Sequence, residues 1–131
     1  MTDIFTREKR SEIMSRIRSK SSLDRKVHNW LCGRHIRHKM YPKVEGSPDI
    51  YLTDAGAYLF LDGNFWHCGP GYRRPKSNVN FWIKHVEEAN VRREERRKRL
   101  PYRWLRIWGN DVRNGRFKEI LEGLSVQSLQ G

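Results

Sequence analysis

The segment AYLFLD, residues 57–62, is the most apolar stretch of the chain and constrains the fold most strongly. A short apolar run between a turn and a glycine predicts a buried strand. The turn TDAG joins it to PDIYL, residues 48–52, and the turn-forming VEGSP separates PDIYL from HIRHKMY, residues 35–41. The pattern therefore predicts three strands linked by hairpin-like turns, with AYLFLD at the centre of the sheet.

Two helices are predicted before these strands. Residues 7–18 have a narrow apolar stripe, so we expect this helix to lie on the domain rather than within it. Ser21 or Ser22 can cap a second helix that ends near Gly33. The apolar residues of the second helix share one face: Leu23, Val27, Trp30 and Leu31.

A long, basic helix is predicted from Ser77 or Asn78 to about Arg99, where Pro101 follows and ends it. Its inward-facing residues are Trp82, Val86 and Ala89. A strand in YRWLRIW, residues 102–108, and a helix over residues 117–124 complete the chain. This order predicts a single α/β domain over residues 1–131, with a central mixed β-sheet flanked by helices.

The charge of the chain indicates its partner. Lys and Arg number 27 against 15 Asp and Glu, for a net charge of +12 and a pI near 10.2. Nucleic acid is the commonest counter-charge for so basic a domain. An anionic membrane is the rival, but no apolar run approaches the roughly 20 residues that span a bilayer. With no apolar leader and two cysteines, Cys32 and Cys68, we expect a reducing cytoplasm.

Acidic residues lie at the ends of two predicted strands: Asp49 begins one strand and Asp62 ends the next. If the strands pair through the TDAG turn, Asp49 and Asp62 lie near one another, with the carbonyl of Leu61 between them. Such oxygen atoms suit Mg²⁺. His67 could then take a proton from water, and a metal beside a poised histidine is typical of phosphodiester hydrolysis. The alternatives are a simple Pro-Asp turn and a packed or surface histidine.

The loop that follows, residues 63–78, is long enough to suggest function. Phe65 and Trp66 either pack in the core or form a wedge between base pairs. The run YRRPKSN contains three candidate phosphate contacts: Arg73, Arg74 and Lys76. RREERRKR is a second basic run, which contacts phosphate or forms a solvated helix face with internal Glu–Arg pairs.

Zinc is not expected. Adjacent residues such as His67 and Cys68 are a poor pair of ligands for one metal, and the chain has no C-x-x-C or H-x₃-H spacing. Cys32 and the remaining histidines add no such spacing.

The residues considered so far resemble one family. The segments RSEIMSRIRSKSS, GSPDIYL, LFLDGNFWH, PKSNVNFW and WLRIW resemble the very-short-patch (VSP) repair DNA mismatch endonucleases, and the likeness covers nearly the whole chain. Members share the restriction-endonuclease-like fold and nick DNA beside the thymine of a G·T mismatch. The piece LFLDGNFWH followed by PKSN-x-x-FW is specific.

The resemblance implies a role for each matching residue. Asp49 matches the aspartate that binds the catalytic Mg²⁺, and Leu61 stands where a backbone carbonyl also binds metal. His67 matches the histidine that activates water. Asp24 stands at an acidic position that reaches the metal through water. Three residues match those that intercalate beside the mismatch, and they are Met14, Phe65 and Trp66.

Three departures from the family pattern stand out. The best-described members have a second histidine where this chain has Asp62, which could instead bind the metal directly. The cysteines of the family's structural zinc are replaced by Asn64 and Asn110, so we expect no zinc and a loop held by packing. The third is a short C-terminal part with GND after the last strand. The changed loop carries Phe65 and Trp66, so mismatch specificity is an open question.

The predicted function is that of a Mg²⁺-dependent DNA endonuclease that nicks one strand at or near a G·T mismatch. It is expected to act as a monomer on double-stranded DNA, in the cytoplasm at the bacterial or phage-type nucleoid, with residues 1–20 as a DNA-contacting arm. Two alternatives stay open. One is a homing or restriction-type nuclease of the same chemistry, and the other is a non-catalytic DNA-binding module.

Overall fold

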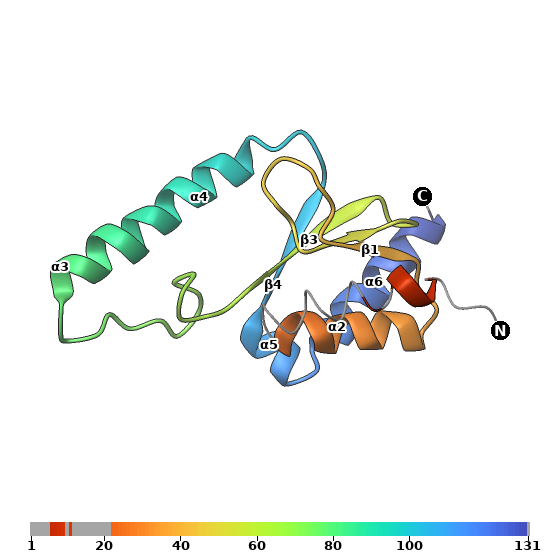
Figure 1. Cartoon of the computed structure of the whole chain (residues 1–131), viewed down its shortest axis with the longest axis horizontal. Helices are drawn as coiled ribbons and strands as arrows, with labels where there is room; N and C mark the ends of the chain where they lie inside the picture. Colours follow the sequence, from red (N-terminus) through yellow and green to blue (C-terminus); the bar gives the residue numbers. More distant parts are fainter. Residues whose placement is uncertain (1–5, 10, 12–21, 131) are drawn as a thin grey trace.

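The computed structural model describes residues 6–9, 11 and 22–130, with side chains described up to residue 124. The elements follow one another in the order that Figure 1 shows. They are helix α2 (Ser22–Gly33), strands β1 (His38–Met40), β2 (Ile50–Leu52) and β3 (Ala57–Asp62), helix α3 (Val79–Trp82), the π-helix η1 (Ile83–Glu87), helix α4 (Glu88–Lys98), strand β4 (Trp104–Trp108), and helices α5 (Gly109–Arg113) and α6 (Phe117–Gln130).

Four strands form one mixed sheet in the order β1-β2-β3-β4. β1 and β2 are antiparallel, as are β2 and β3, and the register places Ile50 opposite Leu59. β4 lies parallel to β3 because the long helical segment between them returns the chain to the other end of the sheet. The predicted α/β class, the mixed sheet and its crossover are confirmed.

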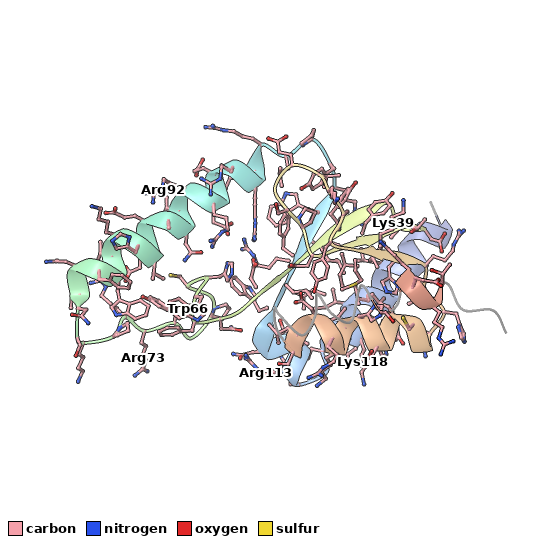
Figure 2. All side chains as sticks on the ribbon, viewed as in Figure 1. Lys39, Trp66, Arg73, Arg92, Arg113 and Lys118 are labelled. Carbon is pink, nitrogen blue, oxygen red and sulfur yellow. The ribbon has the colours of Figure 1, made fainter. Side chains whose placement is uncertain are left out.

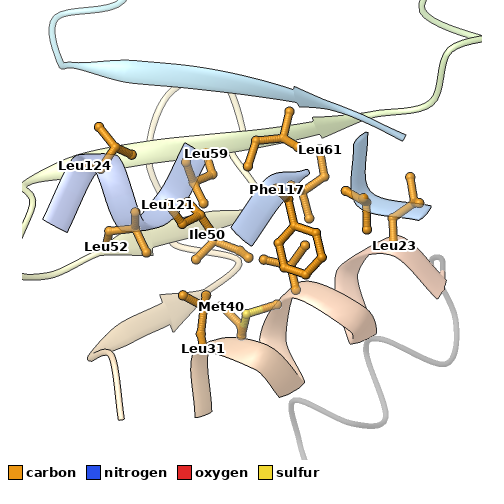
Figure 3. Packing of buried hydrophobic residues seen from close by; sticks show 13 residues of the cluster. Leu23, Leu31, Met40, Ile50, Leu52, Leu59, Leu61, Phe117, Leu121 and Leu124 are labelled. Atoms are coloured by element: carbon orange, nitrogen blue, oxygen red, sulfur yellow. The ribbon is translucent and has the colours of Figure 1, made fainter. Parts of the chain in front are cut away.

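One face of the sheet packs against α2, α5 and α6, and this layer holds the core (Figure 3). Leu31, Ile50 and Phe117 each expose 0% of their surface. The helix that the sequence predicts to end near Gly33 is α2, and its apolar face packs in the core as expected, although Trp30 is only partly buried. Burial of these side chains contributes about 1.5–3 kcal/mol each.

The other face of the sheet is covered differently. Tyr51, Tyr58 and Tyr102 stack in sequence, with ring centroids 4.6 and 4.2 Å apart. Phe60 lies beneath the guanidinium of Arg97, whose Cζ is 3.8 Å from the ring centroid. α3, η1 and α4 run obliquely away from this part of the sheet as an arm (Figure 1). Loop 63–78 leads out to the tip of that arm.

Several expectations for individual elements need adjustment. The predicted strand in residues 35–41 is shorter, and the predicted last helix continues to Gln130. The helix from Asn78 to Arg99 is interrupted by five π-helical residues, which no sequence spacing indicated. Of the helix expected over residues 7–18, residues 7–9 and 11 are helical and the rest lies outside the described residues. In the described part of the chain, none of the helices combines the length and hydropathy that crossing a bilayer requires.

Candidate active site

A cleft of about 560 Å³ opens between the end of β3 and α4. The sheet side contributes Asp49, Leu61, Asp62 and His67. The helix side contributes Arg93, Arg96 and Arg97, and Arg99 follows directly after α4. Carboxylates, an imidazole and guanidinium groups therefore share one concave surface, an arrangement that can bind a phosphate and act on it.

Asp49 is held firmly at the start of β2. Its backbone amide donates to the carbonyl of Leu59 over 2.9 Å, and its Oδ2 accepts a 2.7 Å hydrogen bond from the amide of Leu61. The antiparallel register of β2 and β3, with Ile50 opposite Leu59, brings Asp49 next to Leu61. The sequence predicted that Asp49 and Asp62 lie near one another, and both line this cleft together with Leu61. A carboxylate at the cleft beside a strand end fits the hard oxygen ligands that Mg²⁺ takes, usually one or two carboxylates with several waters.

Asp62 is almost completely buried, with 2% of its surface exposed. Arg97 donates to both of its oxygens, and the Nε of Arg106 donates to Oδ2 over 2.8 Å. Burial acts to raise the pKa of Asp62, but the hydrogen bonds and charge of Arg97, with help from His67 and Arg106, hold that pKa below its ordinary value. The carboxylate is therefore ionised and engaged by two guanidinium groups, whereas the sequence suggested a direct metal ligand.

His67 lies between the sheet and α4. Its Nδ1 is 3.5 Å from Oδ1 of Asp62 and accepts a 2.9 Å hydrogen bond from Arg93. Burial lowers the pKa of His67, the carboxylate of Asp62 raises it, and the nearby arginines lower it, with a net decrease from 6.5. The ring is therefore neutral at pH 7, the form that a general base requires.

Asp24 is buried in the first turn of α2 and does not line the cleft. The hydroxyl of Tyr41 donates to Asp24 Oδ2 over 2.7 Å, and the amide of Tyr41 donates to the carbonyl of Asp49 over 2.8 Å. Tyr41 thus connects the acidic position of α2 to the strand end that bears Asp49. A link of this kind orients the site without direct contact at the reacting atoms.

Aromatic residues gather on loop 63–78 and on the tip of the arm, next to the cleft. Phe65 is 42% exposed and Trp66 is 60% exposed, so neither belongs to the core. Trp82 packs on both, with ring centroids 5.3 and 5.4 Å away. Tyr72 and Phe81 complete the group, which we call the aromatic cluster. Sequence analysis placed Trp82 on an inward face, but its partners are these exposed rings.

The loop is anchored by hydrogen bonds and by one close backbone contact. Asn64 Oδ1 accepts from the amide of Asn110 over 2.9 Å, and its Nδ2 donates to the carbonyl of Pro70 over 3.1 Å. Gly69 lies flat on Trp108, since a Cβ at this position would be 2.6 Å from the indole. Asn64 and Asn110, where the family pattern has zinc-binding cysteines, therefore bridge the loop to α5 directly.

The basic residues of the two runs have different environments. Arg73, Arg74 and Lys76 are all exposed, and Arg74 also forms a two-pronged ion pair with Glu87, at 2.6 and 2.7 Å. Figure 2 shows Trp66 and Arg73 on loop 63–78 and Arg92 on α4. In RREERRKR, Glu95 pairs with Lys98 at 3.4 Å as expected for a helix face. Glu94 instead pairs with Arg106.

Sequence analysis identified RREERRKR as a basic run but did not predict that Arg93, Arg96 and Arg97 line the cleft. Val86, Asn90 and Arg97 are the buried residues of the arm, and they recur at helical spacing. Two of the three are polar, because Arg97 pairs with the ionised Asp62 and Asn90 donates to the carbonyl of Trp66, so an apolar periodicity could not reveal this face. Met14, expected to contact DNA, lies outside the described residues.

The mixed sheet, its flanking helices and this cleft define a nuclease of the restriction-endonuclease-like class. A sequence profile of the family described as DNA mismatch endonuclease Vsr matches residues 2–73, and the chain belongs to this family. The predicted resemblance is thus confirmed, and the protein is a DNA endonuclease.

Three relatives extend the similarity beyond residue 73. The type II nicking enzyme V.NmeAIP of Neisseria meningitidis serogroup A is 31% identical over 122 residues, covering 87% of this chain and 86% of the relative. V.XorIIP of Xanthomonas oryzae pv. oryzae is 35% identical over 102 residues, 74% of each chain. V.NmeDIP of Neisseria meningitidis serogroup C is 32% identical over 120 residues, covering 84% of this chain and 80% of the relative.

Proposed function

We propose that this endonuclease is Mg²⁺-dependent and nicks one strand of double-stranded DNA at or near a G·T mismatch. The observation that carries the proposal is the position of the cleft. Asp49, His67 and the α4 arginines lie on one concave surface, directly beside exposed aromatic rings. Hydrolysis and recognition of a distorted base step thus take place on adjoining surfaces of one chain, which supports action as a monomer.

Asp49 and the carbonyl of Leu61 are the groups that would hold Mg²⁺. When bound, the ion would neutralise charge on the scissile phosphate and on the leaving 3′-oxygen. Arg93, Arg96 and Arg99 bind the phosphates on either side of the cut, since guanidinium groups match phosphate oxygens in pairs. Asp62 is kept in place by Arg97 and positions His67, which differs from the direct metal role that the sequence suggested.

His67 is the general base of the proposed reaction. In the free protein its Nδ1 accepts from Arg93, so the ring proton is on Nε2. When Arg93 turns to a DNA phosphate, Nδ1 can carry the proton and donate to Asp62, which leaves the Nε2 lone pair to accept a proton from water. Attack of that water on phosphorus releases the 3′-oxygen of the broken bond.

The aromatic cluster supplies the mismatch wedge. Phe65 and Trp66 enter the stack beside the mismatch, where unstacking costs less than in a matched duplex. Met14 enters from the opposite groove on the arm of residues 1–20. Arg73 and Lys76 contact phosphates of the DNA backbone. Arg74 must break its ion pair with Glu87 before it can bind a phosphate. Because the proposed substrate is double-stranded DNA, the enzyme would act in the cytoplasm, at the nucleoid.

An endonuclease assay tests the chemistry. Labelled duplexes with randomised bases on both sides of a central G·T pair are incubated with the chain and Mg²⁺ or with EDTA. We expect nicks in one strand only with Mg²⁺, and a fall of at least about 10²-fold in Asp49→Ala and His67→Ala. Asp54→Ala, which removes an exposed carboxylate on the TDAG turn, is the control and should nick normally. Binding without cleavage at any divalent metal would contradict the proposal.

A further inference from the structure

Three metal-ligating side chains meet away from the cleft, between α2 and β1. His28 and Cys32 are four residues apart and share one face of α2, and His38 is the first residue of β1. One ligand atom from each lies within 4.8 Å of the others, and this is the sole His, Cys, Asp or Glu group of that kind among the described residues. None of the three lines the cleft.

The hydrogen bonds of the two histidines fix their orientation. Nδ1 of His38 is 2.7 Å from the carbonyl of Ile36, so this nitrogen carries the ring proton and donates it. The lone pair of His38 Nε2 therefore points at Nδ1 of His28, 2.9 Å away. A histidine whose second nitrogen donates to a backbone carbonyl has the arrangement that histidine ligands of metals usually show.

The distances suit a small tetrahedral ion. Bonds of about 2.0–2.1 Å to nitrogen and about 2.3 Å to sulfur place two nitrogens about 3.3 Å apart and nitrogen and sulfur about 3.6 Å apart. Sγ of Cys32 is 3.9 Å from Nδ1 of His28, the nitrogen that faces His38, so these two atoms would need to approach by about 0.3 Å. The nitrogens of His28 and His38 would need to separate by about 0.4 Å, a small rotation of the two rings.

Burial keeps both rings in the form that binds metal. Each histidine exposes 4% of its surface. Burial, with a contribution from His38, lowers the pKa of His28 to about 4, and burial also lowers the pKa of His38. Both rings are neutral at pH 7, so binding of an ion needs no net loss of a proton from either ring. Cys32 is only partly buried, which gives an ion a path from solvent.

We propose that His28, Cys32 and His38 form a Zn²⁺ site with water as the fourth ligand. Two imidazole nitrogens and one thiolate sulfur form a ligand set that is typical of zinc, whereas magnesium prefers oxygen ligands. On binding, the thiol proton of Cys32 leaves to solvent, and the Nδ1 proton of His28 moves through solvent to Nε2. The ion would then join the end of α2 to the edge strand of the sheet.

This site differs from the family's structural zinc, which the resemblance places between loop 63–78 and Asn110 of α5. Sequence analysis expected no zinc in this chain, because it judged ligands by linear spacing. Here a helix supplies two ligands and a strand the third, so no C-x-x-C or H-x₃-H pattern arises. The two cysteines of the chain lie in different places, and each can serve as the control for the other.

Co²⁺, which reports a thiolate ligand through a charge-transfer absorption band, is the probe for the test. The full chain is stripped with a chelator and titrated with Co²⁺ and then Zn²⁺, as wild type, Cys32→Ser and Cys68→Ser. We expect the band to saturate at about one equivalent in wild type and Cys68→Ser, to be absent in Cys32→Ser, and to disappear when Zn²⁺ displaces Co²⁺.

A measurement of thermal stability tests whether the loss of the Co²⁺ band in Cys32→Ser is caused by misfolding of that variant. In Mg²⁺-free buffer, saturating Zn²⁺ should raise the Tm of wild type and Cys68→Ser by at least about 4 °C and leave that of Cys32→Ser unchanged. The Asp49→Ala variant should keep the band, since the proposed catalytic metal is elsewhere. No band in wild type, or a band that survives in Cys32→Ser or is lost in Cys68→Ser, would overturn the proposal.

Discussion

The guanidinium of Arg93 donates a 2.9 Å hydrogen bond to Nδ1 of His67, the same nitrogen that lies 3.5 Å from Oδ1 of Asp62. One nitrogen cannot accept from Arg93 and donate to Asp62 at once. The free chain therefore holds His67 in the tautomer that lacks a basic Nε2. In the proposed mechanism a DNA phosphate competes with His67 for Arg93, which would couple substrate binding to activation of the base.

The pH dependence of nicking tests this coupling. Burial lowers the pKa of His67 below 6.5, Asp62 raises it and Arg93 lowers it. Since the neutral ring is the active form, the rate should be at its plateau at pH 7 and fall as the pH decreases through that lowered pKa. Arg93→Ala removes a contribution that lowers the pKa, so the acid limb should move to higher pH.

Second-order rates, measured with the chain in excess over DNA but below saturation, report the pKa of the free chain, in which Arg93 contacts His67. Weaker DNA binding lowers this whole profile without moving its acid limb. Arg92→Ala is the matched control, because Arg92 is exposed on α4 (Figure 2) and is not among the charges that shift the pKa of His67. It should leave the position of the acid limb unchanged. A limb that stays in place in Arg93→Ala would contradict the role of Arg93.

The buried ion pair of Asp62 and Arg97 should dominate the stability of the cleft. Asp62→Ala leaves two arginines without their carboxylate, and breaking a buried pair in this way costs about 3–5 kcal/mol. Urea unfolding measures the loss. Asp54→Ala, which removes a carboxylate paired with Arg37 at the exposed hairpin turn, should have little effect. Similar losses of unfolding free energy in Asp62→Ala and Asp54→Ala would contradict the burial of the Asp62–Arg97 pair.

Gly69 should be essential for the conformation of loop 63–78. A methyl group there would sit 2.6 Å from the ring of Trp108, so Gly69→Ala forces the loop away and should cost about 1–3 kcal/mol. Gly123→Ala is the control: no atom lies within 4 Å of the new Cβ on α6, and this change should stabilise by about 0.4–1 kcal/mol. Chemical denaturation measures the change in unfolding free energy for both variants. Changes of the same sign would be inconsistent with the close contact between Gly69 and Trp108.

Trp66 should contribute to substrate selection rather than to stability. Its ring is 60% exposed, so Trp66→Ala should keep the unfolding free energy nearly constant. Stacking on a base is worth about 1–3 kcal/mol, and its loss should reduce kcat/KM on a G·T duplex by about 5- to 150-fold. Val91→Ala, which trims an exposed apolar residue of α4, should nick normally. An unchanged rate in Trp66→Ala would remove the wedge from the mechanism.

The parts of the fold predicted from sequence are those with regular apolar spacing. β3 was located residue for residue, and α2 was located because Leu23, Val27 and Leu31 repeat on one face. The placement of Asp49 and Asp62 at one cleft followed from pairing two strands through a short turn. In each case local pattern and tertiary packing agree.

The remaining features depend on contacts between distant residues. Arg97 belongs to a charged run typical of a solvated face, yet its partner is Asp62, 35 residues earlier. His28 and His38 meet only because α2 ends beside β1. Similarly, the hydrogen bond of Asn64 to Asn110 joins residues 46 positions apart. Single-sequence patterns contain no information on such pairs.

The most direct measurement of the central claim is a competition in one tube. Two duplexes of identical sequence, one with a G·T pair and one with an A·T pair, carry different labels and share a limiting amount of the chain with Mg²⁺. Their ratio of initial nicking rates equals the ratio of kcat/KM. We predict single-strand nicks in the G·T duplex at least about tenfold faster, a difference of about 1.4 kcal/mol. Equal rates on both duplexes would contradict mismatch recognition and leave a nuclease with another target.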